Sequence, residues 1–166
     1  LSFTKFVIFV LAVSLLFPTS SVYGHGLGID TISSIDVKGK KISISVELPM
    51  FFEQTGEKQI TITATEDETK ENAKNVTFLI GLFHENKMIF RNYFFTSDGV
   101  LPIKVNSTQE GEITIHGEQD SLLGAWHGTE YNPIMISGPI FNSGGLYNFE
   151  IEVRTIDEST NIIENS

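Results

Sequence analysis

The chain has 166 residues, with 21 acidic and 11 basic side chains, a formal charge of −10, and no cysteine. Such an acidic surface repels polyanions, which disfavours both nucleic acid and anionic membranes as partners. Without cysteine, the chain can form neither a disulfide nor a thiol nucleophile, so burial of apolar surface must hold the fold together.

The first 24 residues have the composition of a secretory signal. Lys5 precedes an apolar run at 6–17, and small residues at Val22 and Gly24 suit a signal peptidase. As a helix this run would cover about 18 Å, less than the roughly 30 Å of a bilayer core. We therefore predict a signal helix at 1–24 that is cleaved before His25, and an extracellular or cell-surface location. An uncleaved anchor is the alternative.

After the signal, apolar and polar residues alternate, the period of half-buried strands. Turn sequences such as Asp98-Gly99 separate the runs about every ten residues, the spacing of a sandwich or barrel. We predict one domain at 25–157, an antiparallel Greek-key β-sandwich of the immunoglobulin or fibronectin type. Residues 158–166 are expected to be a polar tail or a truncated end. The expected strands lie near 31–37, 41–48, 58–65, 75–84, 87–95, 100–105, 112–117, 132–141 and 146–156.

Three segments of this pattern stand out. The strands at 75–84 and 87–95 are apolar on both faces, which indicates a hairpin that is covered on both sides or meets another domain. Residues 118–131 are the longest expected loop. Tyr147 follows a glycine turn at 143–145, which matches a tyrosine corner, although an aromatic residue at a strand start is an equal alternative.

His25 is the candidate metal ligand. If it is the mature N-terminus, its amine, with a pKa of about 7.7–8.0, and its imidazole can chelate a metal together. Copper(II) favours nitrogen-rich sites of this kind, and a second histidine, His84, His116 or His127, would complete a histidine brace. Our prediction for the metal site is His25, His116 and His127. Alternatively, the histidine is an accident of the cleavage site.

The other motifs give little chemistry. The run starting at His84-Glu85 lacks the second histidine of a zinc protease helix, and the sequence contains no nucleophile elbow or phosphate-binding glycine loop. We therefore expect no enzymatic activity and no cofactor other than copper in the alternative. Asn75 and Asn106 begin glycosylation sequons, and the second is expected in a loop.

Three stretches resemble the N-terminal region of large exported β-domain proteins of ammonia-oxidising archaea. They are residues 25–31, residues 75–80 with the hairpin that follows, and residues 138–141 with 143–147. These stretches consist of packing and turn residues, so the resemblance implies a fold rather than a reaction. Members are often labelled "peptidase", but no residues of this chain carry that chemistry.

The favoured interpretation is a secreted or cell-surface module with a structural or partner-binding role. Its partner would be a protein or another cell-surface component, with no nucleic acid and no membrane beyond the signal segment. The alternative is an extracytoplasmic copper-binding protein that uses His25. A third possibility is a module of a larger protein that packs through the 75–95 hairpin.

Cleavage after Gly24 predicts that mass spectrometry of the exported protein will find His25 as its first residue. Under the copper hypothesis, that protein should bind copper(II) with nitrogen ligation in electron paramagnetic resonance. One extra residue before His25 should abolish this signal because it removes the free amine. A different mature N-terminus would end the copper hypothesis and leave the predicted fold unaffected.

Overall fold

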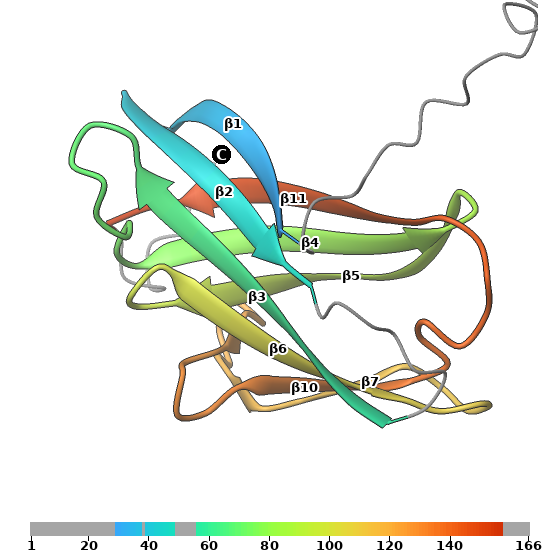
Figure 1. Ribbon diagram of the computed structural model, residues 1–166. Helices are drawn as coiled ribbons and strands as arrows, with labels where there is room; N and C mark the ends of the chain where they lie inside the picture. Colours follow the sequence, from blue (N-terminus) through green and yellow to red (C-terminus); the bar gives the residue numbers. More distant parts are fainter. Residues whose placement is uncertain (1–28, 38, 49–55, 158–166) are drawn as a thin grey trace, which may run out of the picture.

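Two β-sheets packed face to face make up the computed structural model (Figure 1). It describes residues 29–37, 39–48 and 56–157. The predicted signal at 1–24 and the predicted tail at 158–166 lie outside these residues. Among the described residues, no helix is long and apolar enough to cross a membrane.

The first sheet has six strands in the order β1-β2-β3-β6-β10-β7. Neighbouring strands are antiparallel except β10 and β6, which run parallel. The strands are β1 (Ile29–Val37), β2 (Lys40–Glu47), β3 (Gly56–Glu66), β6 (Val100–Ser107), β10 (Ile134–Gly138) and β7 (Thr114–His116).

The second sheet has five strands in the order β11-β4-β5-β9-β8. Here β5 and β9 are the parallel pair, and the other neighbours are antiparallel. The strands are β11 (Tyr147–Thr155), β4 (Val76–His84), β5 (Lys87–Thr96), β9 (Trp126–His127) and β8 (Glu118–Gln119).

The predicted all-β sandwich is confirmed, and each of the nine expected strands has a counterpart. Two details differ from the prediction. The sheets are mixed rather than purely antiparallel, and the expected loop at 118–131 contains the short strands β8 and β9. A strand of two residues is too short to show a period of two, so hydrophobic alternation could not reveal it.

The core consists of the inward-facing residues of both sheets. In β4, the inward residues Val76, Phe78, Ile80 and Leu82 are 0–1% exposed. Phe78 lies directly opposite Phe94 of β5, and both rings are completely buried. Burial of a side chain of this size stabilises a fold by about 1.5–3 kcal/mol, so this aromatic pair is a main stabilising contact.

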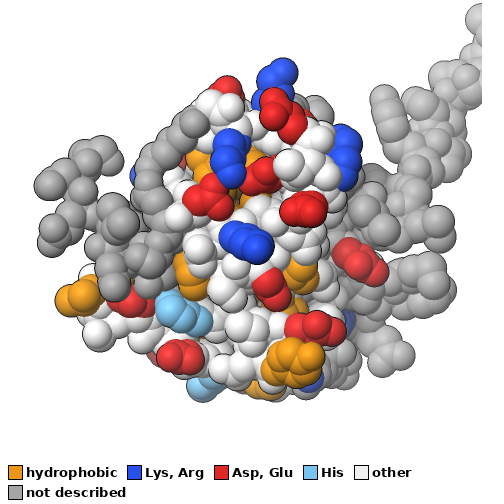
Figure 2. Space-filling view, turned by 90° about the vertical axis from the view of Figure 1, so that its left-hand side faces the viewer, with side chains coloured by type: hydrophobic (Ala, Val, Ile, Leu, Met, Phe, Trp, Pro, Cys, Tyr) orange, Lys and Arg blue, Asp and Glu red, His pale blue; other side chains and the backbone are white. Residues whose placement is uncertain are grey.

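An ion triad joins the two sheets at one end of the sandwich. Lys40 of β2 donates hydrogen bonds to Asp157, just after β11, at 2.6 Å and to Glu66 of β3 at 2.7 Å. The bonds to Asp157 and then Glu66 raise the pKa of Lys40 above its usual range. The ammonium is therefore charged at any physiological pH. Figure 2 shows this end, where basic side chains lie among acidic ones.

Two glycines allow a matched test of turn geometry. Gly99 has a φ of +79°, and a Cβ added there would lie 2.3 Å from the carbonyl oxygen of Ala73. Gly144→Ala would meet nothing within 4 Å. We expect Gly99→Ala to lower the free energy of unfolding by about 1–3 kcal/mol because the turn must strain or shift. Gly144→Ala should change it by less than about 1 kcal/mol. Urea denaturation measures both, and equal effects would contradict the turn geometry.

Candidate functional site

Apolar side chains cover the outer face of the β4–β5 hairpin. Leu79, Phe83, Tyr93 and Phe95 are half-buried and point away from the core, because the residues beside them in each strand are the inward ones. Met88 lies opposite Phe83 and is 56% exposed. We call these five residues the outer apolar band. The band agrees with the sequence prediction that this hairpin is apolar on both faces.

The strand register arranges the band as apolar pairs, with the Gly81–Arg91 pair between two of them. Phe83 pairs with Met88, and Leu79 pairs with Tyr93. Directly opposed side chains have Cβ atoms about 4.5–5.5 Å apart, so these pairs are in contact range. Gly81 lies between these two pairs. Because it has no side chain, the Phe83 ring can pack against its backbone, where a Cβ would lie only 2.9 Å from Phe83 Cε2. The Phe83 ring therefore lies over the glycine together with Arg91 Cγ, which is 3.7 Å from the same Cβ position.

Charged side chains lie across the middle of the band and along its β11 side. Arg91, which lies opposite Gly81, forms an ion pair with Glu152 at 2.6 Å, and Arg154 approaches the same carboxylate at 3.0 Å. Glu150 is exposed beside Gly81 on the other side. One carboxylate thus serves both arginines, while the carboxylate of Glu150 faces solvent.

A row of paired residues crosses one end of the band. Thr77, Phe95, His127 and Glu118 follow one another across β4, β5, β9 and β8. The His127 ring lies 4.9 Å from that of Phe95, measured between centroids. Thr77 Oγ1 and His127 Nε2 are buried, and neither has a hydrogen-bond partner among the described residues. A buried unsatisfied polar group costs about 1–3 kcal/mol, so this row is a weak point of the sheet.

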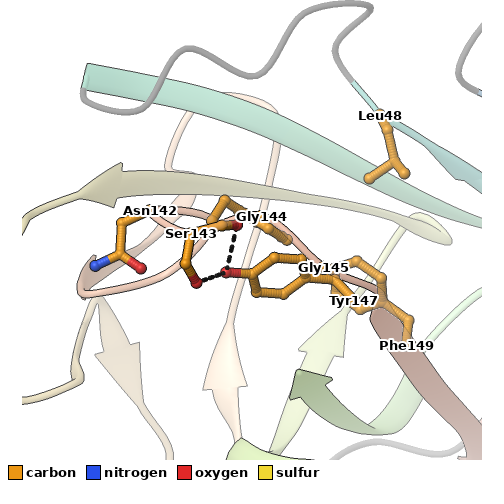
Figure 3. Close-up of a pocket in the computed structure, with 8 residues that line it drawn as sticks. Leu48, Asn142, Ser143, Gly144, Gly145, Tyr147 and Phe149 are labelled. Atoms are coloured by element: carbon orange, nitrogen blue, oxygen red, sulfur yellow. Dashed lines mark hydrogen bonds between the residues drawn. The ribbon is translucent and has the colours of Figure 1, made fainter. Parts of the chain in front are cut away.

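A pocket of about 440 Å³ opens at the other end of the sandwich. Leu48 lies across from Tyr147 and Phe149 of β11 (Figure 3). The Tyr147 hydroxyl lies 3.2 Å from Ser143 Oγ and donates to the Ser143 carbonyl at 3.4 Å. The phenol therefore bonds back to the backbone of the preceding turn, which confirms the contact expected of a tyrosine corner. The remaining lining residues are Phe141, Asn142, Gly144 and Gly145.

The polar side chains around this pocket already have hydrogen-bond partners. Asn142 Nδ2 donates to the backbone carbonyls of Thr108 and Gln109. His84 stacks on Tyr147 at 4.3 Å, and its Nε2–H donates to the Gly144 carbonyl at 2.9 Å. The described lining residues include no acid–base pair. Its lining thus combines apolar side chains with polar groups that are already hydrogen-bonded.

The structure places two of the three predicted copper ligands, and they lie in different sheets. His116 ends β7, with Nε2 at 3.1 Å from Thr114 Oγ1, whereas His127 lies in β9 against Phe95. His25 lies outside the described residues. Within those residues, no group of three or more metal-binding side chains occurs. Copper binding through His25 therefore stays a prediction.

The two sequons have different environments. Asn106 was expected in a loop, but it lies near the end of β6, exposed to solvent. The period of two continues through Asn106 and Ser107, and this signal could have extended the predicted strand. Asn75 directly precedes β4 with a φ of +49° and is half-buried.

Comparisons with protein-family models, curated proteins and solved structures find no match. The resemblance to exported archaeal proteins therefore stays a prediction. Among the described residues, the outer apolar band departs from the pattern of an ordinary solvated sheet face. The row through His127 was not predicted, because it depends on β8 and β9.

Two tyrosines allow a matched test of the corner. Tyr147→Phe removes the hydroxyl that contacts Ser143, and we expect the free energy of unfolding to fall by about 0.5–1.5 kcal/mol. Tyr131 is 95% exposed, so Tyr131→Phe should change it by less than about 0.5 kcal/mol. Chemical denaturation followed by circular dichroism compares the two. A Tyr147→Phe variant as stable as the wild type would mean that the corner does not stabilise the fold.

Proposed function

We propose that this protein is a secreted or cell-surface β-sandwich module that binds a partner protein through the outer apolar band. The observation that carries the proposal is the position of the band, on the solvent side of a sheet whose other side already faces the core. Clustered apolar surface of this kind typically marks an interaction site. The proposal assigns no catalysis to the chain.

The other sheet provides an internal comparison. Its outward residues on β2 and β3 include Ser43, Ser45, Thr61 and Thr63, and Lys104 faces outward on β6. This is the usual pattern, in which an antiparallel sheet is apolar toward the core and polar toward water. The same chain thus builds one ordinary outer face and one apolar face, which argues that the apolar face has a separate role.

Charge indicates the nature of the partner. The chain carries a formal charge of −10, and Glu118 and Glu150 are exposed near the band. The nearby Arg91 and Arg154 are already paired with Glu152. We therefore expect a partner surface with an apolar centre and basic residues around it. A second copy of the chain is disfavoured because two such acidic molecules repel each other.

The finer fold assignment is part of this proposal. The chain passes between the sheets after β3, β5, β7, β9 and β10. Such crossings are required for a Greek key, and the Tyr147 contact supports an immunoglobulin- or fibronectin-like sandwich. Proteins of this architecture often act as binding modules, but the architecture alone does not specify a function.

A cell-binding measurement tests the proposal. We expect the labelled exported protein to bind saturably to washed cells of its own organism, and protease treatment of the cells to remove the binding. Leu79→Ser with Tyr93→Ser should weaken binding at least about tenfold, because both residues lie in the centre of the band. The matched control is Thr61→Ala with Thr63→Ala on the polar face, which should leave binding unchanged.

Three results would contradict the proposal. They are unsaturable binding, equal binding by both double variants, and self-association that the Leu79→Ser, Tyr93→Ser variant abolishes. The last result, seen by light scattering, would identify a second copy as the occupant of the band. Reproducible turnover in a broad hydrolase screen would contradict the non-catalytic part.

A further inference from the structure

The outer face of the six-stranded sheet displays a possible modification site. Asn106 is exposed on β6, and its neighbours in the ladder are Glu57 of β3 and Ser137 of β10. It is followed by Ser107 and Thr108, so it begins an asparagine-x-threonine sequon.

The packing of β6 determines that Asn106 points outward. Val105 and Ser107, on either side of it, face the core and are only 2–3% exposed. The Ser107 hydroxyl accepts a hydrogen bond from Lys58 Nζ at 3.1 Å, inside the sandwich. A shift of one residue would bury Asn106 and expose Val105, so the core and this buried bond fix the register.

The third residue of the sequon lies in a turn just beyond β6. The Thr108 N–H donates to the Gly138 carbonyl at 2.9 Å, and its hydroxyl donates to the Glu110 carbonyl at 2.8 Å. Thr108 is half-buried, and Gln109 and Glu110, which follow it, are exposed. Among the described residues, the exposed side chain of Asn106 therefore has room for a bulky group at this end of β6.

The other sequon has a less tolerant environment. Asn75 is half-buried, and its N–H donates to the Ser97 carbonyl at 3.1 Å. The preceding residue, Lys74, accepts a backbone hydrogen bond from Asp157. Thr77, the third sequon residue, is 1% exposed in β4. A glycan at Asn75 would have to fit among these packed segments, whereas one at Asn106 projects into solvent.

We propose that Asn106 carries an N-linked glycan in the exported protein. The donor is an oligosaccharide linked to a polyprenyl phosphate or diphosphate lipid. A bond forms between Asn106 Nδ2 and the anomeric carbon of the first sugar, and the bond from that carbon to the phosphate oxygen breaks. The lipid phosphate leaves with the bonding electrons, and the amide loses one proton. Because β6 is paired on both sides, transfer precedes the pairing of this sheet.

The glycan gives the sandwich two different outer faces. It lies on the polar six-stranded sheet, while the outer apolar band lies on the five-stranded sheet. A glycan on the polar face leaves the band accessible to the proposed partner. The modification itself does not depend on the binding proposal, and the two can fail separately.

Peptide mass spectrometry of the protein exported by its own cells tests this site. Trypsin separates the two sequons, because Lys74 and Lys104 immediately precede the peptides 75–87 and 105–154. We expect a glycan mass on the 105–154 peptide. The increment should disappear in Asn106→Gln and in Thr108→Ala, and it should persist in Thr108→Ser, which keeps the hydroxyl that the sequon requires.

An unmodified 105–154 peptide in the exported protein would overturn the proposal, and so would a glycan that remains in Thr108→Ala. A glycan on the 75–87 peptide alone would also overturn it. Thermal unfolding of Asn106→Gln serves as the control for folding. A melting temperature within a few degrees of the wild type shows that loss of the glycan mass reflects loss of the acceptor.

Discussion

The fold depends on the burial of one stripe of side chains from each main strand between the two sheets. The chain has no cysteine, so no covalent crosslink can replace this burial. The central contributors are aromatic and branched residues, with Phe78 against Phe94 in one sheet and isoleucines in both. Contacts at the strand ends add to this burial, namely the turns, the ion triad at Lys40 and the tyrosine corner. Each can stabilise the fold only because the buried stripes already hold the strands in register.

This constraint leaves the outward stripes free to differ. A side chain that faces water contributes little to the core, so its identity can follow another requirement. On β3 the outward residues include Thr61, Thr63 and Thr65, whereas on β4 and β5 they include Leu79, Phe83 and Tyr93. The five-stranded sheet therefore exposes apolar surface that the core does not need. Stability alone does not explain that choice, whereas the proposed recognition of a partner would.

The sequence predicted the parts of the fold that depend on long alternation. Strands such as β2 and β11 repeat the pattern over eight or nine residues, so they were found with nearly correct ends. The short strands β8 and β9 were missed because their own residues carry no strand pattern. They are strands because β9 pairs with β5 and β8 pairs with β9. The apolar character of the 75–95 hairpin was predictable, but the row from Thr77 to His127 depends on cross-strand register, which local patterns do not determine. Asn106 was placed in a loop because its own side chain is polar, although it continues the alternation of β6.

The acidic charge and the apolar band act together. An exposed apolar face on a sheet invites association with any similar surface, including another copy of the chain. A formal charge of −10 opposes that association at long range. The same charge attracts a basic surface. Under the binding proposal, the charge would therefore favour a basic partner over a second copy of the chain. An acidic exterior would thus let the outer apolar band serve the proposed partner while opposing self-association.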